Sequence, residues 1–88
     1  MTKHFTYKPV GVCCTEISFD LVDGILHNVD LYGGCRGNTT GINRLVEGMP
    51  AREVYIRTKG VECHGGHSCP GELANAIAAC YAEMGETL

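Results

Sequence analysis

The stretch TEISFDLVDGILHNVDLY, residues 15–32, decides the fold of this chain. In its first half, the apolar residues Ile17, Phe19 and Leu21 alternate with polar neighbours, which is the period of a strand with one buried face. A second apolar-rich run, ILHNVDLY, follows after a short connection that ends in Gly24. Two strands joined by so few residues pair antiparallel, so the sequence predicts a β-hairpin.

The connection between the two strands allows two registers. A two-residue turn made by Asp23 and Gly24 would place Phe19 opposite the polar Asn28. A three-residue loop with a left-handed Gly24 would instead pair Phe19 with His27 and keep nearly all apolar residues on one face. Because a slip of one residue turns a strand's buried side chains to the other face, we predict the three-residue loop.

The predicted register brings cysteines together at the open end of the hairpin. It places Cys13 opposite Gly33, with Cys35 just beyond. Two cysteines that are far apart in the sequence are therefore expected to lie near each other in the fold.

The remaining elements are one strand and three helices. A strand is expected over residues 5–8, where apolar and polar side chains alternate before Pro9. Helical spacing predicts three helices: one with the stripe Ile42, Leu45, Val46 and Met49 and a start at Thr39 or Thr40, one with Pro50 in its first turn and Gly60 beyond its end, and one over residues 70–84. In the second of these, residues 54–56 could also form a strand. The predicted fold is a single α+β domain over residues 1–88, with an antiparallel sheet of about three strands and three helices on one face.

Length and charge limit the function classes. A chain of 88 residues buries only about 60 to 65% of its unfolded surface, so its core is thin and a further link between elements would stabilise it. The net charge of −3 and the scattered lysines and arginines argue against nucleic-acid binding. The sequence has neither a run of roughly 20 apolar residues that could span a membrane nor an apolar export signal at its start. We therefore expect a cytoplasmic protein whose partner is another protein.

The six cysteines are the chemically informative residues. In a reducing compartment, such a density indicates metal ligation or redox chemistry rather than a disulfide framework. Cys80 falls within the apolar stripe of the last helix, where a cysteine behaves as a small apolar side chain. Cys14 follows Cys13 and is expected to point to the opposite face of the strand, so we do not assign it to the same site.

Four cysteines remain as candidate metal ligands: Cys13, Cys35, Cys63 and Cys69. Four thiolates complete a tetrahedral site without an open position, which suits structural zinc first and an iron–sulfur cluster second. Cys69 precedes Pro70 at a helix start, where backbone N–H groups favour a thiolate. The five residues between Cys63 and Cys69 exceed the usual spacing of zinc knuckles. A thiol–disulfide redox function of Cys63 and Cys69 therefore stays open as an alternative.

The histidines and carboxylates carry weaker signals. His64 and His67 lie in the glycine-rich run VECHGGHSCPGEL, residues 61–73, and are secondary candidates as ligands. The sequence shows no phosphate-binding loop, no Ser-His-Asp order and no paired carboxylates suited to acid and base catalysis. We therefore assign no catalytic residue.

The motifs GVCCTEISF, GGCRGN, LVEGM, GVECHGGHSCPGELA and AIAA occur in this order. Together they resemble the small stand-alone proteins of the TSCPD domain family, over about residues 5 to 82. The family keeps four cysteines, and the resemblance implies that they correspond to Cys13, Cys35, Cys63 and Cys69. The Thr-Ser-Cys-Pro-Asp motif of the family reads His67-Ser68-Cys69-Pro70-Gly71 in this chain, so its first and last positions differ.

Related domains occur at the C-terminal end of adenosylcobalamin-dependent ribonucleotide reductases, and the resemblance implies a link to ribonucleotide reduction. That enzyme needs a large catalytic barrel, a cobalamin site and a nucleotide pocket, which 88 residues cannot supply. The resemblance therefore implies an accessory or metal-binding module rather than a ribonucleoside-diphosphate reductase.

A weaker resemblance is to the iron–sulfur scaffold proteins of the IscU and NifU type. Their three cysteines would correspond to Cys13, Cys35 and Cys69. Thr15 and Ser68 stand where those scaffolds have an aspartate and a histidine. Cys63 would complete a closed site, which suits a structural or stored metal better than transfer of a cluster. An iron–sulfur scaffold or carrier is therefore the second functional hypothesis.

Overall fold

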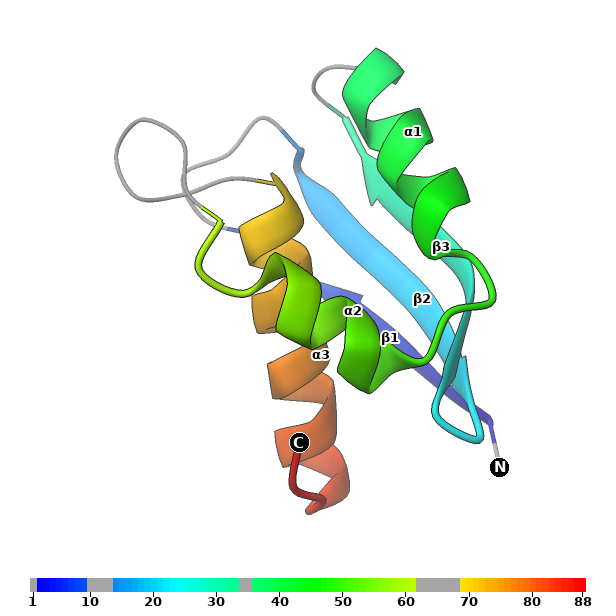
Figure 1. Cartoon of the computed structure of the whole chain (residues 1–88), viewed down its shortest axis with the longest axis vertical. Helices are drawn as coiled ribbons and strands as arrows, with labels where there is room; N and C mark the ends of the chain where they lie inside the picture. The colour runs from blue at the N-terminus through cyan, green and yellow to red at the C-terminus, as the bar shows by residue number, and fades with distance from the viewer. Residues whose placement is uncertain (1, 10–13, 34–35, 62–68) are drawn as a thin grey trace.

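The computed structural model describes residues 2–9, 14–33, 36–61 and 69–88 (Figure 1). Its elements follow in the order β1 (Thr2–Tyr7), β2 (Glu16–Val22), β3 (Ile25–Tyr32), α1 (Arg36–Val46), α2 (Ala51–Thr58) and α3 (Cys69–Met84). The three strands form one antiparallel sheet in the order β1-β2-β3. The predicted α+β fold is confirmed.

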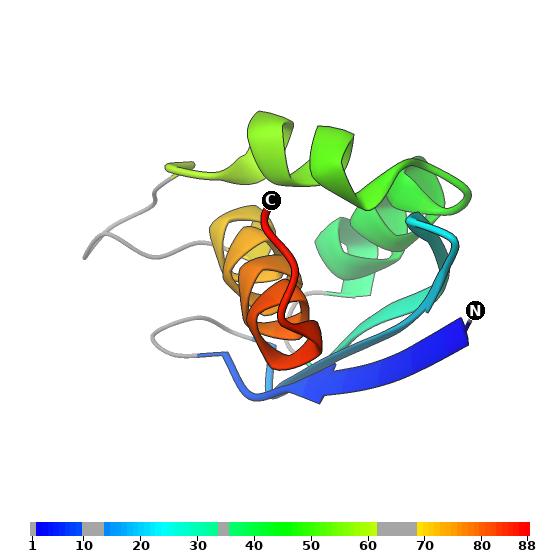
Figure 2. The same ribbon diagram turned by 90° about the horizontal axis from the view of Figure 1, so that it is seen from below.

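The helices cover one face of the sheet. Figure 2 shows α3 between the strands and α2, and α1 alongside β3. The opposite face of the sheet carries exposed polar side chains, among them Thr6, Glu16 and Asp30. The alternation of apolar and polar residues in β1 and β2 therefore separates a covered face from an open one.

The turn of the hairpin differs from the predicted one. Val22 pairs with Ile25, so the loop consists of Asp23 and Gly24 alone. Both loop residues have positive φ, 50° for Asp23 and 83° for Gly24, as a type I′ turn requires. The three-residue loop was the wrong choice, because the Asp-Gly turn already has the twist that paired strands need.

A β-bulge in β3 explains how the shorter loop still buries the apolar residues. Close to the turn Asp20 pairs with His27, whereas further along Ser18 pairs with Asp30, so β3 has one extra residue between these pairs. Asn28 lies in this interval with a φ of 52°, a left-handed conformation that asparagine tolerates better than most residues. The extra residue restores the inward direction of the apolar side chains in the rest of β3.

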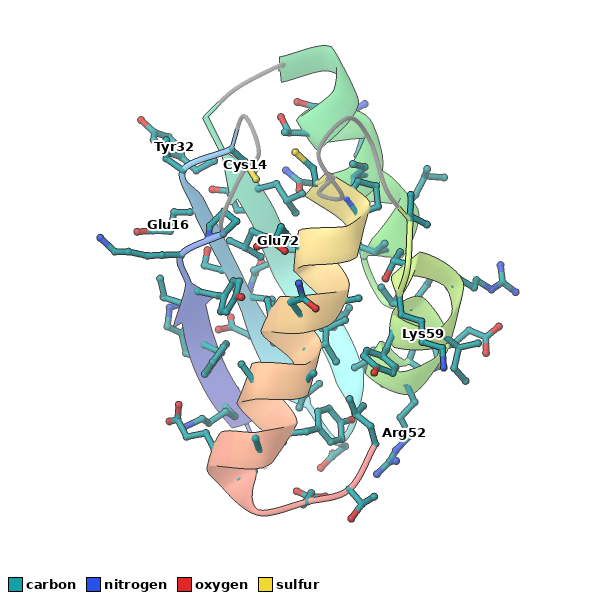
Figure 3. The ribbon with its side chains drawn as sticks, turned by 90° about the vertical axis from the view of Figure 1, so that its left-hand side faces the viewer. Cys14, Glu16, Tyr32, Arg52, Lys59 and Glu72 are labelled. Atoms are coloured by element: carbon teal, nitrogen blue, oxygen red, sulfur yellow. The ribbon has the colours of Figure 1, made fainter. Side chains whose placement is uncertain are left out.

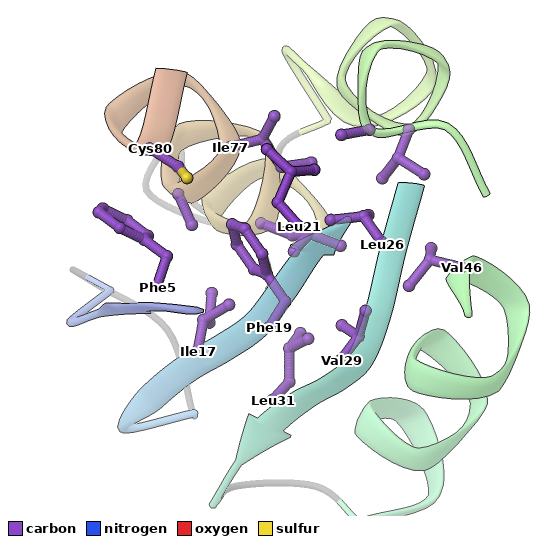
Figure 4. Packing of buried hydrophobic residues seen from close by; sticks show 14 of the residues in the cluster. Phe5, Ile17, Phe19, Leu21, Leu26, Val29, Leu31, Val46, Ile77 and Cys80 are labelled. Carbon is purple, nitrogen blue, oxygen red and sulfur yellow. The ribbon is translucent and has the colours of Figure 1, made fainter. Parts of the chain in front are cut away.

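The core lies between the sheet and α3 (Figure 4). Its largest fully buried side chains are Phe19, Ile17, Leu26, Leu31, Leu73, Ile77, Val54, Cys14 and Cys80. The rings of Phe5 and Phe19 pack with their centroids 5.9 Å apart. Complete burial of a large apolar side chain is worth about 1.5–3 kcal/mol, so this cluster holds the sheet and α3 together. Cys80 has no exposed surface, which confirms its prediction as a core residue.

The segment that joins α1 to α2 covers the outer edge of β3. The Leu26 N–H donates to the Met49 carbonyl at 2.9 Å, and the Leu26 carbonyl accepts from the Gly48 N–H at 2.8 Å. The Ala51 N–H donates to the Gly24 carbonyl at 2.8 Å. These bonds satisfy backbone groups that an edge strand would otherwise expose, and they fix the start of α2 beside the hairpin turn.

The start of α1 lies earlier than predicted. The helix begins at Arg36, whereas the apolar stripe suggested a start at Thr39 or Thr40. One member of that stripe, Leu45, is 75% exposed. A stripe of apolar residues indicates which side of a helix packs against the core. It does not show at which residue the helix begins.

The long helix α3 agrees with its prediction and has a well-formed C-terminal end. It begins at Cys69, one residue before Pro70. At its other end, the Glu86 N–H donates to the Tyr81 carbonyl at 3.0 Å, and Gly85 has a φ of 74°, the pattern of a Schellman motif. Within the described ranges, no helix is long and apolar enough to cross a membrane.

Candidate functional site

The candidate site lies around the thiol of Cys69, at the first residue of α3. Cys69 is partly buried and packs against the apolar core. Leu73 and Ile77, one and two turns further along α3, have no exposed surface, so this part of the helix is firmly held. The N-terminal end of a helix carries the positive end of the helix dipole. A negatively charged ligand sulfur is electrostatically favoured at such a place.

Of the four predicted metal ligands, only Cys69 lies within the described residues. The other three, Cys13, Cys35 and Cys63, lie outside them, as do the secondary candidates His64 and His67. In the part of the chain that the structure describes, no three His, Cys, Asp or Glu side chains gather closely enough to hold a metal ion. The four-thiolate site therefore stays a prediction.

Cys14, which the sequence analysis set apart, lies close to Cys69. The Cys14 side chain is 2% exposed and belongs to the core cluster against which Cys69 packs. The pKa of the Cys14 thiol is raised to about 12, mainly by burial and then by its interaction with the Cys69 thiol. Figure 3 shows Cys14 close to the end of the molecule at which α3 begins. The fold therefore brings together two thiols from distant parts of the sequence.

The open end of the hairpin holds Cys14 in place. The Thr15 N–H and hydroxyl both donate to the Tyr32 carbonyl, at 2.8 and 3.3 Å. Gly33 is required next to this contact, because its φ is 88° and a Cβ there would lie 2.9 Å from the Thr15 hydroxyl oxygen. Gly33 thus faces Thr15, which corrects the predicted pairing of Gly33 with Cys13.

The strand pattern explains why Cys14 was missed. Strict alternation places its side chain on the face opposite to the core, but β2 begins only at Glu16. Residues before a strand do not follow its period of two, so the side chain of Cys14 can turn inward. One signal could have found it: a free cysteine is among the residue types most often buried, which favours a core position for a cysteine beside a buried strand.

A buried carboxylate lies close to the two thiols. Glu72, one turn beyond Cys69, is 3% exposed and accepts a hydrogen bond of 2.6 Å from the Asn75 side-chain amide. Its charge contributes to the raised pKa of the Cys14 thiol, after burial and the interaction with Cys69. For Tyr7, burial raises the pKa of the phenol most, and the charge of Glu72 adds to it. The first turn of α3 therefore combines a partly buried thiol with a buried carboxylate.

A second polar cluster lies on the open face of the sheet. The ring of His4 and the side-chain amide of Asn28 both hydrogen-bond the carboxylate of Asp20, at 2.6 and 2.9 Å. The Asn28 bond, followed by the His4 bond, lowers the pKa of Asp20. This cluster is solvent-accessible and lies on the face opposite to the thiols, so it belongs to the surface of the sheet.

Comparison with known families identifies the relatives of the chain. The family model of the TSCPD domain matches residues 2–81. The chain belongs to the TSCPD domain family. The resemblance seen in the sequence is thereby confirmed, and the TSCPD match covers Cys14 as well as all four predicted ligands. No curated protein and no solved structure matches the chain.

Proposed function

We propose that this TSCPD domain is a metal-binding module in which the thiolates of Cys13, Cys35, Cys63 and Cys69 hold one zinc ion. The observation that carries the proposal is the position of Cys69, a partly buried thiol at the start of a firmly packed helix. An iron–sulfur cluster bound by the same four thiolates is the second candidate. When bound, zinc supplies a fixed tetrahedral link between ligands and no redox chemistry of its own.

The arrangement of the elements supports ligands from distant parts of the chain. β2 begins at Glu16, α1 at Arg36 and α3 at Cys69. Figures 1 and 3 show these three starts toward the same end of the molecule. Cys35 directly precedes Arg36 in the sequence, and Cys13 is three positions before Glu16. Chain connectivity limits how far each of these thiols can lie from that end.

The charge around the start of α3 also supports a bound cation. Glu72 is 3% exposed, and its carboxylate lies near enough to Cys14 to raise the pKa of that thiol. The Glu72 carboxylate already accepts a hydrogen bond from the Asn75 side-chain amide, and its negative charge would in addition attract a divalent cation held by Cys69.

The size of the domain gives the metal a role in folding. Metal ligation by thiolates contributes to the free energy of folding, because the site does not exist in the unfolded chain. A link among the starts of β2, α1 and α3 would add a cross-link to a chain of 88 residues, which is too short to form a large core.

The module is proposed to act on a protein partner, as an accessory to ribonucleotide reduction. Exposed apolar side chains support a protein contact: Leu45 on α1 and Ile56 on α2 are 75% and 60% exposed. The test is a titration against an adenosylcobalamin-dependent ribonucleotide reductase, followed by calorimetry. Binding that is lost after chelation of the metal supports this role, and heat of dilution alone contradicts it.

Metal analysis of anaerobically purified protein tests the proposed site. We expect one zinc per chain and no visible absorption. Charge-transfer bands with iron and sulfide in the sample would move the assignment to the iron–sulfur candidate. A metal-free chain that takes up neither zinc nor iron after reduction would contradict both assignments.

Variants test the ligand set. Cys69→Ser and Cys35→Ser each remove one proposed ligand and should reduce the metal content to well below one per chain. Cys80→Ser is the matched control, because Cys80 is a fully buried cysteine of α3 that the site does not use. It should keep the metal. Equal metal content in all three variants would contradict the ligand set.

A further inference from the structure

We propose that the chain forms a symmetric dimer in which β1 pairs antiparallel with β1 of a second copy, so that two three-stranded sheets become one continuous sheet. The inference goes beyond metal binding and uses none of the proposed metal ligands. It rests on the direction of the backbone groups of β1, which the contacts of β3 determine.

Within the described residues, β1 is the open edge of the sheet. Its neighbour in the strand order is β2 alone, whereas the segment before α2 covers the outer edge of β3. Figure 3 shows β1, in dark blue, at the margin of the molecule. An edge strand presents a row of N–H and C=O groups with which another strand can pair.

The contacts of β3 show which backbone groups of the sheet point outward. The Leu31 N–H donates to the Asn43 side chain of α1 at 3.0 Å and thus points away from β2. Residues directly opposite in an antiparallel pair point their backbone groups either toward each other or away from each other. Ile17 lies opposite Leu31, so its backbone groups point away from β3 and toward β1. The bonds of Leu26 to the segment before α2 give the same direction for Leu21, its partner in β2.

This direction determines the outer edge of β1. Tyr7 lies opposite Ile17, so the backbone groups of Tyr7 bond to β2. The pairing of β1 with β2 is regular along its whole length. Because backbone groups alternate in direction from residue to residue, the N–H and C=O groups of Thr2, His4 and Thr6 point away from β2. No other described strand pairs with them.

β1 has few of the features that keep edge strands from pairing. Such strands commonly carry a proline, charged side chains or a β-bulge. Residues 2–7 contain no proline, and their pairing with β2 has no bulge. Their one lysine, Lys3, lies on the same face of the sheet as Phe5 and pairs with Glu83 of α3 at 2.6 Å. The edge is therefore regular and suited to a further strand.

A second copy of β1 is complementary to this edge. Paired residues in a sheet point their side chains to the same face, so a symmetric antiparallel pair must have one residue on its two-fold axis. With Phe5 on the axis, the Phe5 rings of the two copies lie opposite each other, beside the contact that each makes with its own Phe19. His4 of one copy then lies opposite Thr6 of the other. Both residues have outward backbone groups, so each such pair exchanges both of its N–H···O bonds.

The same register is favourable for the charges on the covered face. It places Lys3 of one copy opposite Tyr7 of the other. Burial raises the pKa of Tyr7 most, and the charge of nearby Glu72 adds to the rise. The Lys3 ammonium thus approaches a carboxylate of the second copy. A register with His4 on the axis would instead place two histidines opposite each other, which is unfavourable when both are protonated.

The small size of the contact predicts a dimer that exchanges with the monomer. β1 has six residues, and a pair of such strands buries less than the roughly 1,200–2,000 Å² of a stable protein interface. The dimer should therefore form only at high protein concentration. Sedimentation velocity over a wide range of concentrations measures it, and a chain that stays monomeric up to millimolar concentration would overturn the proposal.

Amide hydrogen exchange identifies the pairing strand. The full-length protein is exchanged below and above the concentration at which it dimerises, and the exchange rate of each residue is read by fragmentation mass spectrometry. The His4 and Thr6 amides should exchange fast in the dilute sample and several-fold more slowly in the concentrated one. The Phe5 amide bonds to β2 and should exchange slowly in both. A dimer that leaves the His4 and Thr6 rates unchanged would overturn the proposal.

Two substitutions at one position separate the edge from the rest of the sheet. Thr6→Pro removes an outward N–H without removing a bond between β1 and β2, so the chain should fold and stay monomeric. Thr6→Val keeps this N–H and is the matched control, which should dimerise as the wild type does. A folded Thr6→Pro chain that dimerises equally well would overturn the proposal.

A charge reversal provides a second test in case Thr6→Pro folds poorly, which far-UV circular dichroism will show. Lys3→Glu places a carboxylate near Glu72 of the second copy and should weaken dimerisation several-fold at low salt, with a smaller effect at high salt. Equal dimerisation of Lys3→Glu and the wild type at low salt would contradict the proposed register and overturn the proposal.

Discussion

The backbone N–H of Asn28 donates a hydrogen bond of 3.1 Å to the carboxylate of Glu47. The next residue, Val29, donates its N–H to the other oxygen of the same carboxylate at 3.3 Å. Glu47 thus serves two backbone donors at the β-bulge of β3. It also fixes the residue that follows α1 to the edge of the sheet.

This relationship predicts that Glu47→Ala destabilises the fold. The substitution removes the acceptor of two backbone donors at the bulge, and we expect a loss of about 0.5–1.5 kcal/mol in the free energy of unfolding. Denaturant unfolding measures it. Glu53→Ala is the control, because it removes an exposed carboxylate that pairs with Arg57 at 2.8 Å, and it should cost at most about 0.5 kcal/mol. Equal losses in both variants would show that Glu47 is an ordinary surface residue.

Gly33→Ala should also destabilise the fold. Its φ of 88° disfavours any side chain, and the added Cβ would lie 2.9 Å from the Thr15 hydroxyl oxygen. We expect a loss of about 1–3 kcal/mol, visible as a lower denaturation midpoint. Gly41→Ala, within α1 and with open space around its Cβ, should instead raise stability by about 0.5–1 kcal/mol. A gain in stability from Gly33→Ala would contradict the described backbone.

Asp20 should make stability depend on pH in the acid range. Its pKa in the folded state is lowered, so the folded state binds the proton of this carboxyl less readily than the unfolded chain does. The contribution is therefore complete above the unfolded value of about 3.9 and is lost as the pH falls through the folded value. Urea unfolding between about pH 6 and pH 2.5 measures this loss.

Two variants identify the source of that dependence. Asn28→Gly removes the amide that lowers the pKa of Asp20 most, and glycine still tolerates the φ of 52°. It should make the acid loss smaller, as should Asp20→Asn. An unchanged acid profile in Asp20→Asn would assign the dependence to other carboxyls.

Thiol alkylation should follow the order of exposure. In chelator-treated protein at about pH 8, iodoacetamide should modify Cys69 at least tenfold faster than Cys14 or Cys80, since thiolate access controls this reaction. Cys14 is 2% exposed, and burial raises its thiol pKa to about 12, so few Cys14 thiolates exist at that pH. Quantitative peptide mapping over time gives the three rates. Modification of Cys14 as fast as Cys69 would show that Cys14 is not enclosed as described.

Much of the fold could be predicted from local sequence patterns. Alternation identified β1 and β2, helical spacing with Pro70 and Gly85 identified α3, and Pro50 marked the position before α2. These features depend on residues close together in the sequence. The register of β3 could not be predicted in this way, because the bulge at Asn28 is stabilised by Glu47, a side chain from another element.

The candidate site was predictable only in part. The position of Cys69 at a helix start followed from Pro70 and the apolar stripe of α3. The proximity of Cys69 to Cys14 did not, because it depends on how the chain enters β2 before the regular strand begins. The same limit applies to Glu72, whose burial results from packing of α3 and not from any local pattern of charge.

Because the outer edge of β3 is covered, the sheet has one edge strand, β1, with which a further strand could pair. Leu26 and its neighbours already bond to the segment before α2, whereas β1 pairs only with β2 among the described residues. An added strand, from a second copy or from another protein, could therefore join this sheet only along β1. Residues 2–7 would have to supply the backbone groups for that contact.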